Sequence, residues 1–159
     1  MSEIQSAEKP EASPDRVLAT RLAIAGAIPF LVLSLWLAAI PLDHVWRGTT
    51  IALLTSYAAL VLSFLGGARW ALAVAGGYEQ ARRDIAISVV PALLGWTVLF
   101  LPPHIAMVLL AVAFAAHGAW DAFSGQAGVL PAWFARLRTQ LTAIAVISMI
   151  VAFAATAAG

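Results

Sequence analysis

Five long apolar stretches constrain this chain more than any other feature of its sequence. They run over residues 17–40, 50–75, 85–101, 104–123 and 139–158, separated by short segments with charges or turn residues. About 20 helical residues cross the hydrocarbon core of a bilayer, and about 17–25 is the usual range. Backbone amides in lipid must be satisfied within their own segment, so each stretch is expected to be a helix. The sequence therefore predicts an all-α integral membrane bundle of five transmembrane helices.

The composition agrees with lipid as the main solvent. The 159 residues are 62% hydrophobic and only 11% charged, whereas soluble domains are about half apolar and about a quarter charged. We expect one transmembrane domain over residues 17–159. Residues 1–16 are polar and acidic, and they resemble neither a secretory signal nor a transit peptide, so we expect a short disordered tail. The net charge of +1 is too small to attract nucleic acid, so we expect no nucleic-acid partner.

The basic residues predict the orientation in the membrane. One side of the predicted bundle holds Lys9, Arg16, Arg21, Arg69, Arg82, Arg83, Arg136 and Arg138. The opposite side holds only Arg47. Because Lys and Arg in short loops stay on the cytoplasmic side, we expect a cytoplasmic N-terminus and a periplasmic C-terminus in a bacterial inner membrane.

Proline and small residues predict how the spans bend and pack. Pro29 and Pro91 should kink the first and third spans, and Pro102-Pro103 should close a tight hairpin. Small residues recur on the second span, where they would let another helix approach closely. That helix could belong to the same chain, which we favour, or to a second copy. The packing residues are Thr55, Ala59, Ser63, Gly66, Gly67 and Ala71.

Three ionisable side chains fall within or near the spans: Arg69, His117 and Asp121. Arg69 and Asp121 should lie at similar depths, and His117 lies one turn from Asp121 on the same helix face. A charge at this depth costs about 2.5–3.5 kcal/mol even on permissive scales, so these groups should face protein or water. We expect a polar cluster, joined by Ser88 and Thr142. It could be a structural ion pair, the interpretation we favour, or a pocket for a ligand or protons.

The residues needed for catalysis are missing from the sequence. The chain has no cysteine and three His. His44 and His104 lie on the outer side, about 20 Å of helix from His117, so no metal site is expected. Asp121 is the only embedded Asp, and no motif for phosphate binding occurs. We therefore expect no catalytic residue, no cofactor and no enzyme activity.

The segment before the last span carries a further feature. Trp133, Arg136 and Arg138 form an aromatic and basic patch at the predicted cytoplasmic interface. Such a patch suits contact with anionic head groups, at about 1 kcal/mol per cation. We expect it to anchor the last span at the interface, although it could also dock a membrane partner.

Two local strings carry a resemblance to a known family. The first is Ser63-Phe64-Leu65-Gly66-Gly67 followed by Arg69-Trp70, and the second runs from Leu130-Pro131 to Thr142. Over residues 50–150 the chain resembles a family of uncharacterised multi-pass membrane proteins of the DUF3429 type, which includes mitochondrial transmembrane protein 69. In that family a small residue follows the Trp of the first string, and Ala71 stands there in this chain. The resemblance implies a helical inner-membrane protein and no established activity.

The functional hypothesis combines these observations. We expect an uncharacterised, non-catalytic accessory, assembly or scaffold protein that acts through helix–helix contacts. Its partners would be the lipid bilayer and an inner-membrane complex or further copies of itself. The alternative is a small transporter or ligand-binding membrane module that uses the polar cluster at the cytoplasmic end of the bundle.

Overall fold

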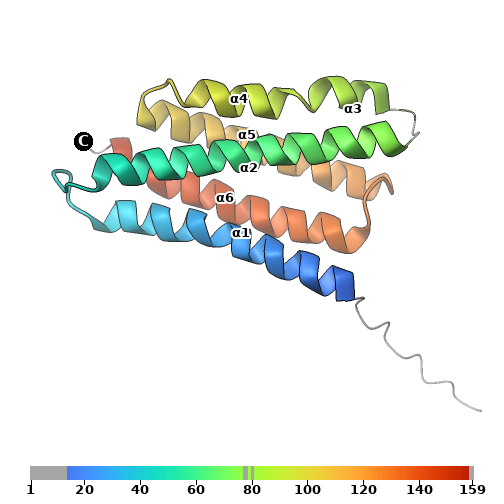
Figure 1. Cartoon of the computed structure of the whole chain (residues 1–159), viewed down its shortest axis with the longest axis horizontal. Helices are drawn as coiled ribbons and strands as arrows, with labels where there is room; N and C mark the ends of the chain where they lie inside the picture. The colour runs from blue at the N-terminus through green and yellow to red at the C-terminus, as the bar shows by residue number, and fades with distance from the viewer. Residues whose placement is uncertain (1–13, 77–78, 80, 158–159) are drawn as a thin grey trace, which may run out of the picture.

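The computed structural model describes residues 14–76, 79 and 81–157. Within these residues the chain forms six helices and no strand. In chain order they are α1 (Pro14–Ala39), α2 (Arg47–Gly76), α3 (Ala81–Ile87), α4 (Val90–Val98), α5 (Pro103–Gln126) and α6 (Ala132–Ala157). All run along the long axis of the molecule, and α3 and α4 follow one another beside α2 (Figure 1).

The helices form a closed ring of neighbours. Helix α1 contacts α2 and α6, α6 contacts α5, α5 contacts α4, and α4 contacts α2. Helix α2 also reaches across the ring to α5. The buried core lies between them and is built from Phe30, Leu37, Leu54, Leu62, Met107, Leu110, Phe114 and Met149.

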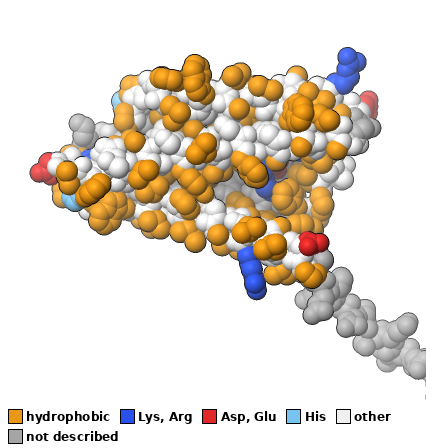
Figure 2. Space-filling model, viewed as in Figure 1, with side chains coloured by type: hydrophobic (Ala, Val, Ile, Leu, Met, Phe, Trp, Pro, Cys, Tyr) orange, Lys and Arg blue, Asp and Glu red, His pale blue; other side chains and the backbone are white. Residues whose placement is uncertain are grey.

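The outside of the bundle carries many large apolar side chains. Phe64, Phe100 and Phe123 are each about 70% exposed, at 71%, 70% and 68%. Hydrophobic side chains cover the visible face, and the charged groups stand mainly at its two ends (Figure 2). Soluble monomers rarely expose continuous apolar surface on this scale. Four helices, α1, α2, α5 and α6, are long and apolar enough to cross a bilayer. The prediction of an all-α membrane bundle is therefore confirmed.

The third predicted span, 85–101, departs from a single kinked helix. The chain forms two short helices, α3 and α4, interrupted at 88–89. Pro91 lies just beyond the interruption and has no amide hydrogen for the carbonyl of Ile87, so the ladder fails there. By contrast, α1 continues through Pro29. Helix α1 also starts at Pro14, so residues 14–16 belong to a helix rather than to the predicted tail, and residues 1–13 lie outside the described part.

Helix α2 approaches its neighbour closely at the α3–α4 interruption. A Cβ on Gly66 would lie 2.5 Å from the Ser88 carbonyl oxygen, so only glycine allows this approach. Ser63 and Ala59 meet Gly95 of α4 one and two turns further along.

The other predicted packing residues on α2 divide between the inside and the outside. Thr55 is buried, whereas Gly67 and Ala71 are exposed and face away from the bundle. Residues spaced by four advance about 40° per step around a helix of about 3.6 residues per turn. Over the four steps from Thr55 to Ala71 the row therefore turns about 160°, out of the intramolecular interface.

Arg47, the first residue of α2, binds the ends of α1 and α6 at the opposite end of the bundle from the predicted cluster. Its guanidinium donates to the carbonyls of Leu37 and Ile40 at 3.4 Å each, and to the carbonyl of Ala155. The last carbonyls of a helix have no partner within the helix, and a cation satisfies them well. The basic residue that departs from the predicted charge separation thus caps the ends of α1 and α6.

A buried charge cluster as candidate functional site

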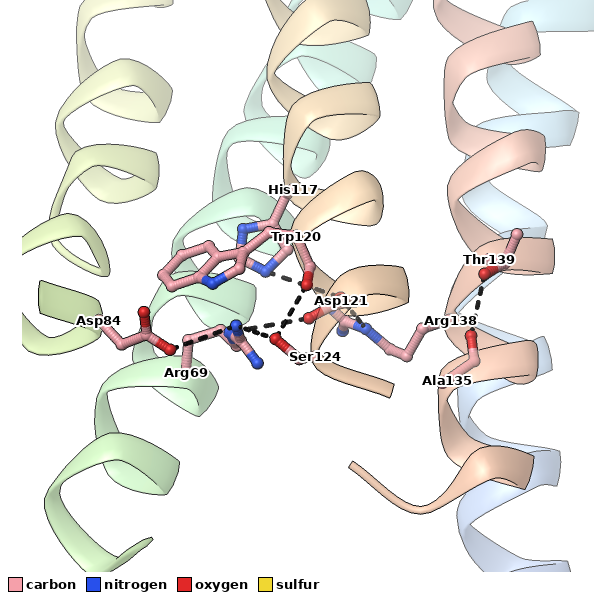
Figure 3. Close-up of polar contacts among 9 residues, drawn as sticks. All are labelled: Arg69, Asp84, His117, Trp120, Asp121, Ser124, Ala135, Arg138 and Thr139. Carbon is pink, nitrogen blue, oxygen red and sulfur yellow. Dashed lines mark hydrogen bonds and ion pairs between the residues drawn. The ribbon is translucent and has the colours of Figure 1, made fainter. Parts of the chain in front are cut away.

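Charged and polar side chains from four helices meet in the interior near one end of the bundle. We call this group the charge cluster, comprising Arg69 of α2, Asp84 of α3, His117, Asp121 and Ser124 of α5, and Arg138 of α6. Their side chains point toward one another between the helices (Figure 3). All except Arg138 are buried, and the side chain of Arg138 is only 11% exposed.

Asp121 is the centre of the charge cluster. Its Oδ2 accepts a hydrogen bond from Arg138 Nε at 2.7 Å and lies 2.5 Å from Arg138 Nη2. Its Oδ1 lies 3.8 Å from Arg69 Nε, and His117 Nε2 lies 3.9 Å from Oδ2. At these two distances the Arg69 guanidinium and the His117 ring lie near the carboxylate but do not form hydrogen bonds with it. One carboxylate therefore joins α2, α5 and α6.

Arg69 connects the centre to α3. Its Nη2 donates to Ser124 Oγ at 2.6 Å and lies 3.5 Å from Asp84 Oδ2. The guanidinium carbon stands 4.1 Å from the centroid of the Trp120 ring, a cation–π contact. Ser124 in turn donates to the Trp120 carbonyl at 2.9 Å, as helical serines commonly do.

The charges of the cluster balance. Two guanidinium groups face two carboxylates, which limits the cost of burying any of them. Replacing such a network by apolar residues can be neutral, whereas removing one partner costs about 3–5 kcal/mol because the other charge stays buried. The arrangement is therefore sensitive to loss of any one member.

Helical spacing explains how α5 and α6 present these groups. His117, Asp121 and Ser124 follow one another at spacings of four and three, which places them on one face. Asp121 lies five residues before the end of α5 and Arg138 six residues after the start of α6, so the hairpin brings them to the same level. The two helices pack tightly there, because a Cβ on Gly118 would lie 2.5 Å from Thr142 Cγ2.

The structure brings together three of the five residues predicted for the polar cluster: Arg69, His117 and Asp121. Ser88 is buried but donates to the Ile85 carbonyl of its own segment at 2.7 Å. Thr142 lies against Gly118 rather than against the charged groups.

The predicted interface patch is divided by the structure. Arg136 is exposed, and Trp133 is partly exposed with Arg16 5.0 Å from its ring centroid. Arg138, assigned to this patch from the sequence, turns inward to Asp121 instead.

Sequence reasoning missed Asp84, Ser124 and the inward role of Arg138. Ser124 could have been found from its place on the Asp121 face of the helix. Asp84 falls in the predicted loop, because the third span is predicted to begin at residue 85, whereas α3 begins at Ala81. That Arg138 lies beside Asp121 can be inferred only when the end of α5 and the start of α6 are known.

His117 stands at the edge of the cluster and lines a cavity of about 360 Å³ between α5 and the α3–α4 pair. Its side chain is 3% exposed, and neither ring nitrogen has a hydrogen-bond partner among the described residues. A buried polar group without a partner costs about 1–3 kcal/mol. Apart from His117 and Arg83, the cavity wall is almost entirely apolar.

The arrangement suits holding helices together and offering hydrogen bonds to a small molecule. Among the described residues, no group of three or more His, Cys, Asp or Glu is placed to hold a metal ion. The fold and the cluster thus define a multi-pass helical membrane protein with a buried, charge-balanced network.

The comparisons with known proteins place this protein in a family. The family model described as "Protein of unknown function (DUF3429)" matches residues 16–154. The chain therefore belongs to the DUF3429 family, as the resemblance had indicated. It is 35% identical over 102 residues to transmembrane protein 69 of Xenopus tropicalis, a match that covers 60% of this chain and 38% of that protein. No solved structure matches the chain.

Proposed function

We propose that this protein is a non-catalytic accessory or scaffold protein of the bacterial inner membrane that acts through helix–helix contacts. The observation that carries the proposal is the charge cluster, because Arg69, Asp84, Asp121 and Arg138 are all engaged in joining four helices. A network of this kind fixes the register of the helices, and the rigid outer faces are then available to partners.

The proposal includes five crossings of the membrane. Helices α3 and α4 lie end to end along α2 (Figure 1), and residues 81–98 extend about 27 Å at about 1.5 Å per residue. That length is close to the ~30 Å hydrocarbon thickness, so the interrupted pair can serve as one crossing. Of the eight basic residues that the structure describes, seven then lie toward the cytoplasmic end, and Arg47 at the other end donates hydrogen bonds to helix carbonyls.

Reporter fusions test the topology. Alkaline phosphatase, which is active only in the periplasm, should be active after Gly159 and inactive in the loop near residue 128. The chain contains no cysteine, so single cysteines at the exposed positions Asp43 and Ala127 provide an independent test with an impermeant thiol reagent. Labelling of the Ala127 position from outside intact cells would contradict the proposed orientation.

The face of α2 that turns away from the bundle supports contact with a helix outside it. Gly67 and Ala71 are exposed there, and a Cβ on Gly67 would meet nothing within 4 Å. Small residues allow close approach of another transmembrane helix, which drives association in lipid.

Site-specific crosslinking of this face tests the scaffold role. A photoreactive residue at Gly67 of the tagged chain should crosslink to another membrane protein in cells, and mild detergent should extract the two together. The control position is Ala143, an exposed alanine on α6. Recovery of the chain alone from both positions contradicts an accessory role, and a product of twice the chain's mass assigns the face to a second copy.

A second candidate function is a small ligand-binding or transport module, and the observation in its favour is His117 in the cavity between α5 and the α3–α4 pair. A His117→Phe variant separates the two candidates. Loss of complementation of a deletion phenotype at unchanged protein level would favour the ligand-binding module. Full complementation favours the scaffold.

A further inference from the structure

A second cavity, unrelated to His117, lies between α1, α2 and α6. It has a volume of about 440 Å³ and is lined by α1 from Ala19 to Phe30, by α2 from Tyr57 to Ala68 and by α6 from Phe134 to Ala145. Helix α1 diverges from α2 toward its N-terminus (Figure 1), and the surface is hollowed between the two helices (Figure 2). We call this cavity the α1–α2 groove. Its volume is in the range of about 300–1,000 Å³ typical of small-molecule sites.

The length of the α1–α2 groove matches one leaflet of a membrane. The lining residues of α1, from Ala19 to Phe30, extend about 16 Å along the helix at about 1.5 Å per residue. Half of the ~30 Å hydrocarbon core is about 15 Å. The groove thus begins near the end of the bundle that holds the charge cluster and ends near its middle, against Phe30, Tyr57 and Phe114.

The polarity of the α1–α2 groove is confined to one end. Among the residues that the structure describes, Arg138 is the only charged one that lines it, and a basic side chain is visible in the hollow (Figure 2). Thr142 lies one turn deeper, and the Tyr57 hydroxyl is engaged in a 2.7 Å hydrogen bond to the Gly26 carbonyl. The remaining wall is apolar.

Arg138, which lines the groove, keeps one guanidinium nitrogen without a partner among the described residues. Its Nε and Nη2 are directed to Asp121, and its Nη1 makes no hydrogen bond or ion pair with any described residue. The N–H groups of this nitrogen can donate charge-assisted hydrogen bonds to a phosphate oxygen. Arg16, stacked over Trp133 beside the groove-lining Phe134, adds positive charge at the same end.

We propose that the α1–α2 groove binds one acyl chain of an anionic phospholipid, with the phosphate of that lipid beside Arg138. A cationic hydrogen-bond donor near the end of the bundle and an apolar wall about one leaflet long are what such a molecule requires. The lipid enters sideways from the bilayer, and its chain fills the space that α1 and α2 leave open. This binding is independent of the scaffold role proposed above.

Lipid retention by the full chain tests the proposal. The protein is reconstituted in nanodiscs of equal parts phosphatidylglycerol and phosphatidylcholine, and native mass spectrometry then counts the lipids that stay bound on release. We expect one phosphatidylglycerol per chain. Equal retention of the two lipids, or a chain without lipid, overturns the proposal.

A matched pair of variants on α1 places the lipid in the groove. Ala23 lines the α1–α2 groove, whereas Ala25 is exposed and does not. Ala23→Phe fills the groove from α1, a helix that contributes no residue to the charge cluster, and should lower retention at least tenfold, whereas Ala25→Phe should leave retention unchanged. Equal retention by both variants overturns the proposal. A disulfide-linked dimer through Ala23→Cys, in this cysteine-free chain, assigns the groove to a second copy and also overturns it.

The headgroup preference tests the role of Arg138. Arg138→Gln should reduce the preference for phosphatidylglycerol over phosphatidylcholine about fivefold, the factor that corresponds to about 1 kcal/mol for one interfacial cation. An unchanged preference in a folded Arg138→Gln protein contradicts the assignment of the phosphate to this residue. The Ala23→Phe and Ala25→Phe pair remains decisive if the Arg138 variant does not fold.

Discussion

Replacement of Asp121 by Asn removes one negative charge from the centre of the buried network. The side chain of Asp121 is 2% exposed, that of Arg69 4% and that of Arg138 11%, so solvent can screen little of the change. Two guanidinium groups then face only Asp84. Removing one partner of a buried ion pair typically costs about 3–5 kcal/mol, and we expect Asp121→Asn to lower the free energy of unfolding by this amount.

A second replacement should cost less stability in the Asp121→Asn protein than it does alone. In Asp121→Asn/Arg138→Gln the remaining Arg69 and Asp84 balance each other, at an Nη2 to Oδ2 distance of 3.5 Å. The double variant should therefore be more stable than the sum of the two single changes predicts. Direct neighbours of this kind couple by about 0.5–3 kcal/mol, and the short Arg138–Asp121 contacts favour a value above about 1.5 kcal/mol within that range.

Reversible unfolding in mixed micelles with increasing SDS measures these free energies, followed by tryptophan fluorescence. Trp120 reports on the site because its ring centroid lies 4.1 Å from the guanidinium carbon of Arg69. Asp43→Asn is the control, since Asp43 is exposed in the loop between α1 and α2. The charge cluster would not stabilise the fold as we infer if the effects of the two single changes on the free energy of unfolding were additive. The same would follow if Asp121→Asn had no larger effect than the control.

Three further predictions concern single contacts, each measured by the same unfolding assay. Gly66→Ala should destabilise the protein by about 1–3 kcal/mol, because the added Cβ would collide with the Ser88 carbonyl oxygen at the α3–α4 interruption. Gly67→Ala should be neutral or stabilising by up to about 1 kcal/mol, because the added Cβ would contact no other described residue. Equal effects would contradict the packing. Arg47→Lys should cost about 1.5–3 kcal/mol, since an ammonium cannot serve carbonyls of both α1 and α6, and hydrogen exchange should rise at both helix ends. Tyr57→Phe should cost about 1 kcal/mol through loss of the bond to the Gly26 carbonyl, and no loss would indicate that the bond is not formed in the bilayer.

The long apolar runs determine that this chain forms membrane helices, whatever their neighbours. Four of the predicted spans correspond to α1, α2, α5 and α6, with ends that differ by up to seven residues. The cost of a charge in lipid likewise singled out Arg69, His117 and Asp121, because any ionisable group at such a depth must be sheltered. These inferences depend on local composition and therefore needed no knowledge of the packing.

The rotation of each helix was decided only by the tertiary structure. In a soluble helix, polar and apolar faces differ and reveal which side is buried. Here the faces that meet lipid and the faces that meet protein are both apolar, so Gly66 on the inside and Gly67 on the outside are alike in the sequence. The inward turn of Arg138 and the opening between α1 and α2 both depend on which helices become neighbours. That choice arises from close packing across the bundle, which no single segment encodes.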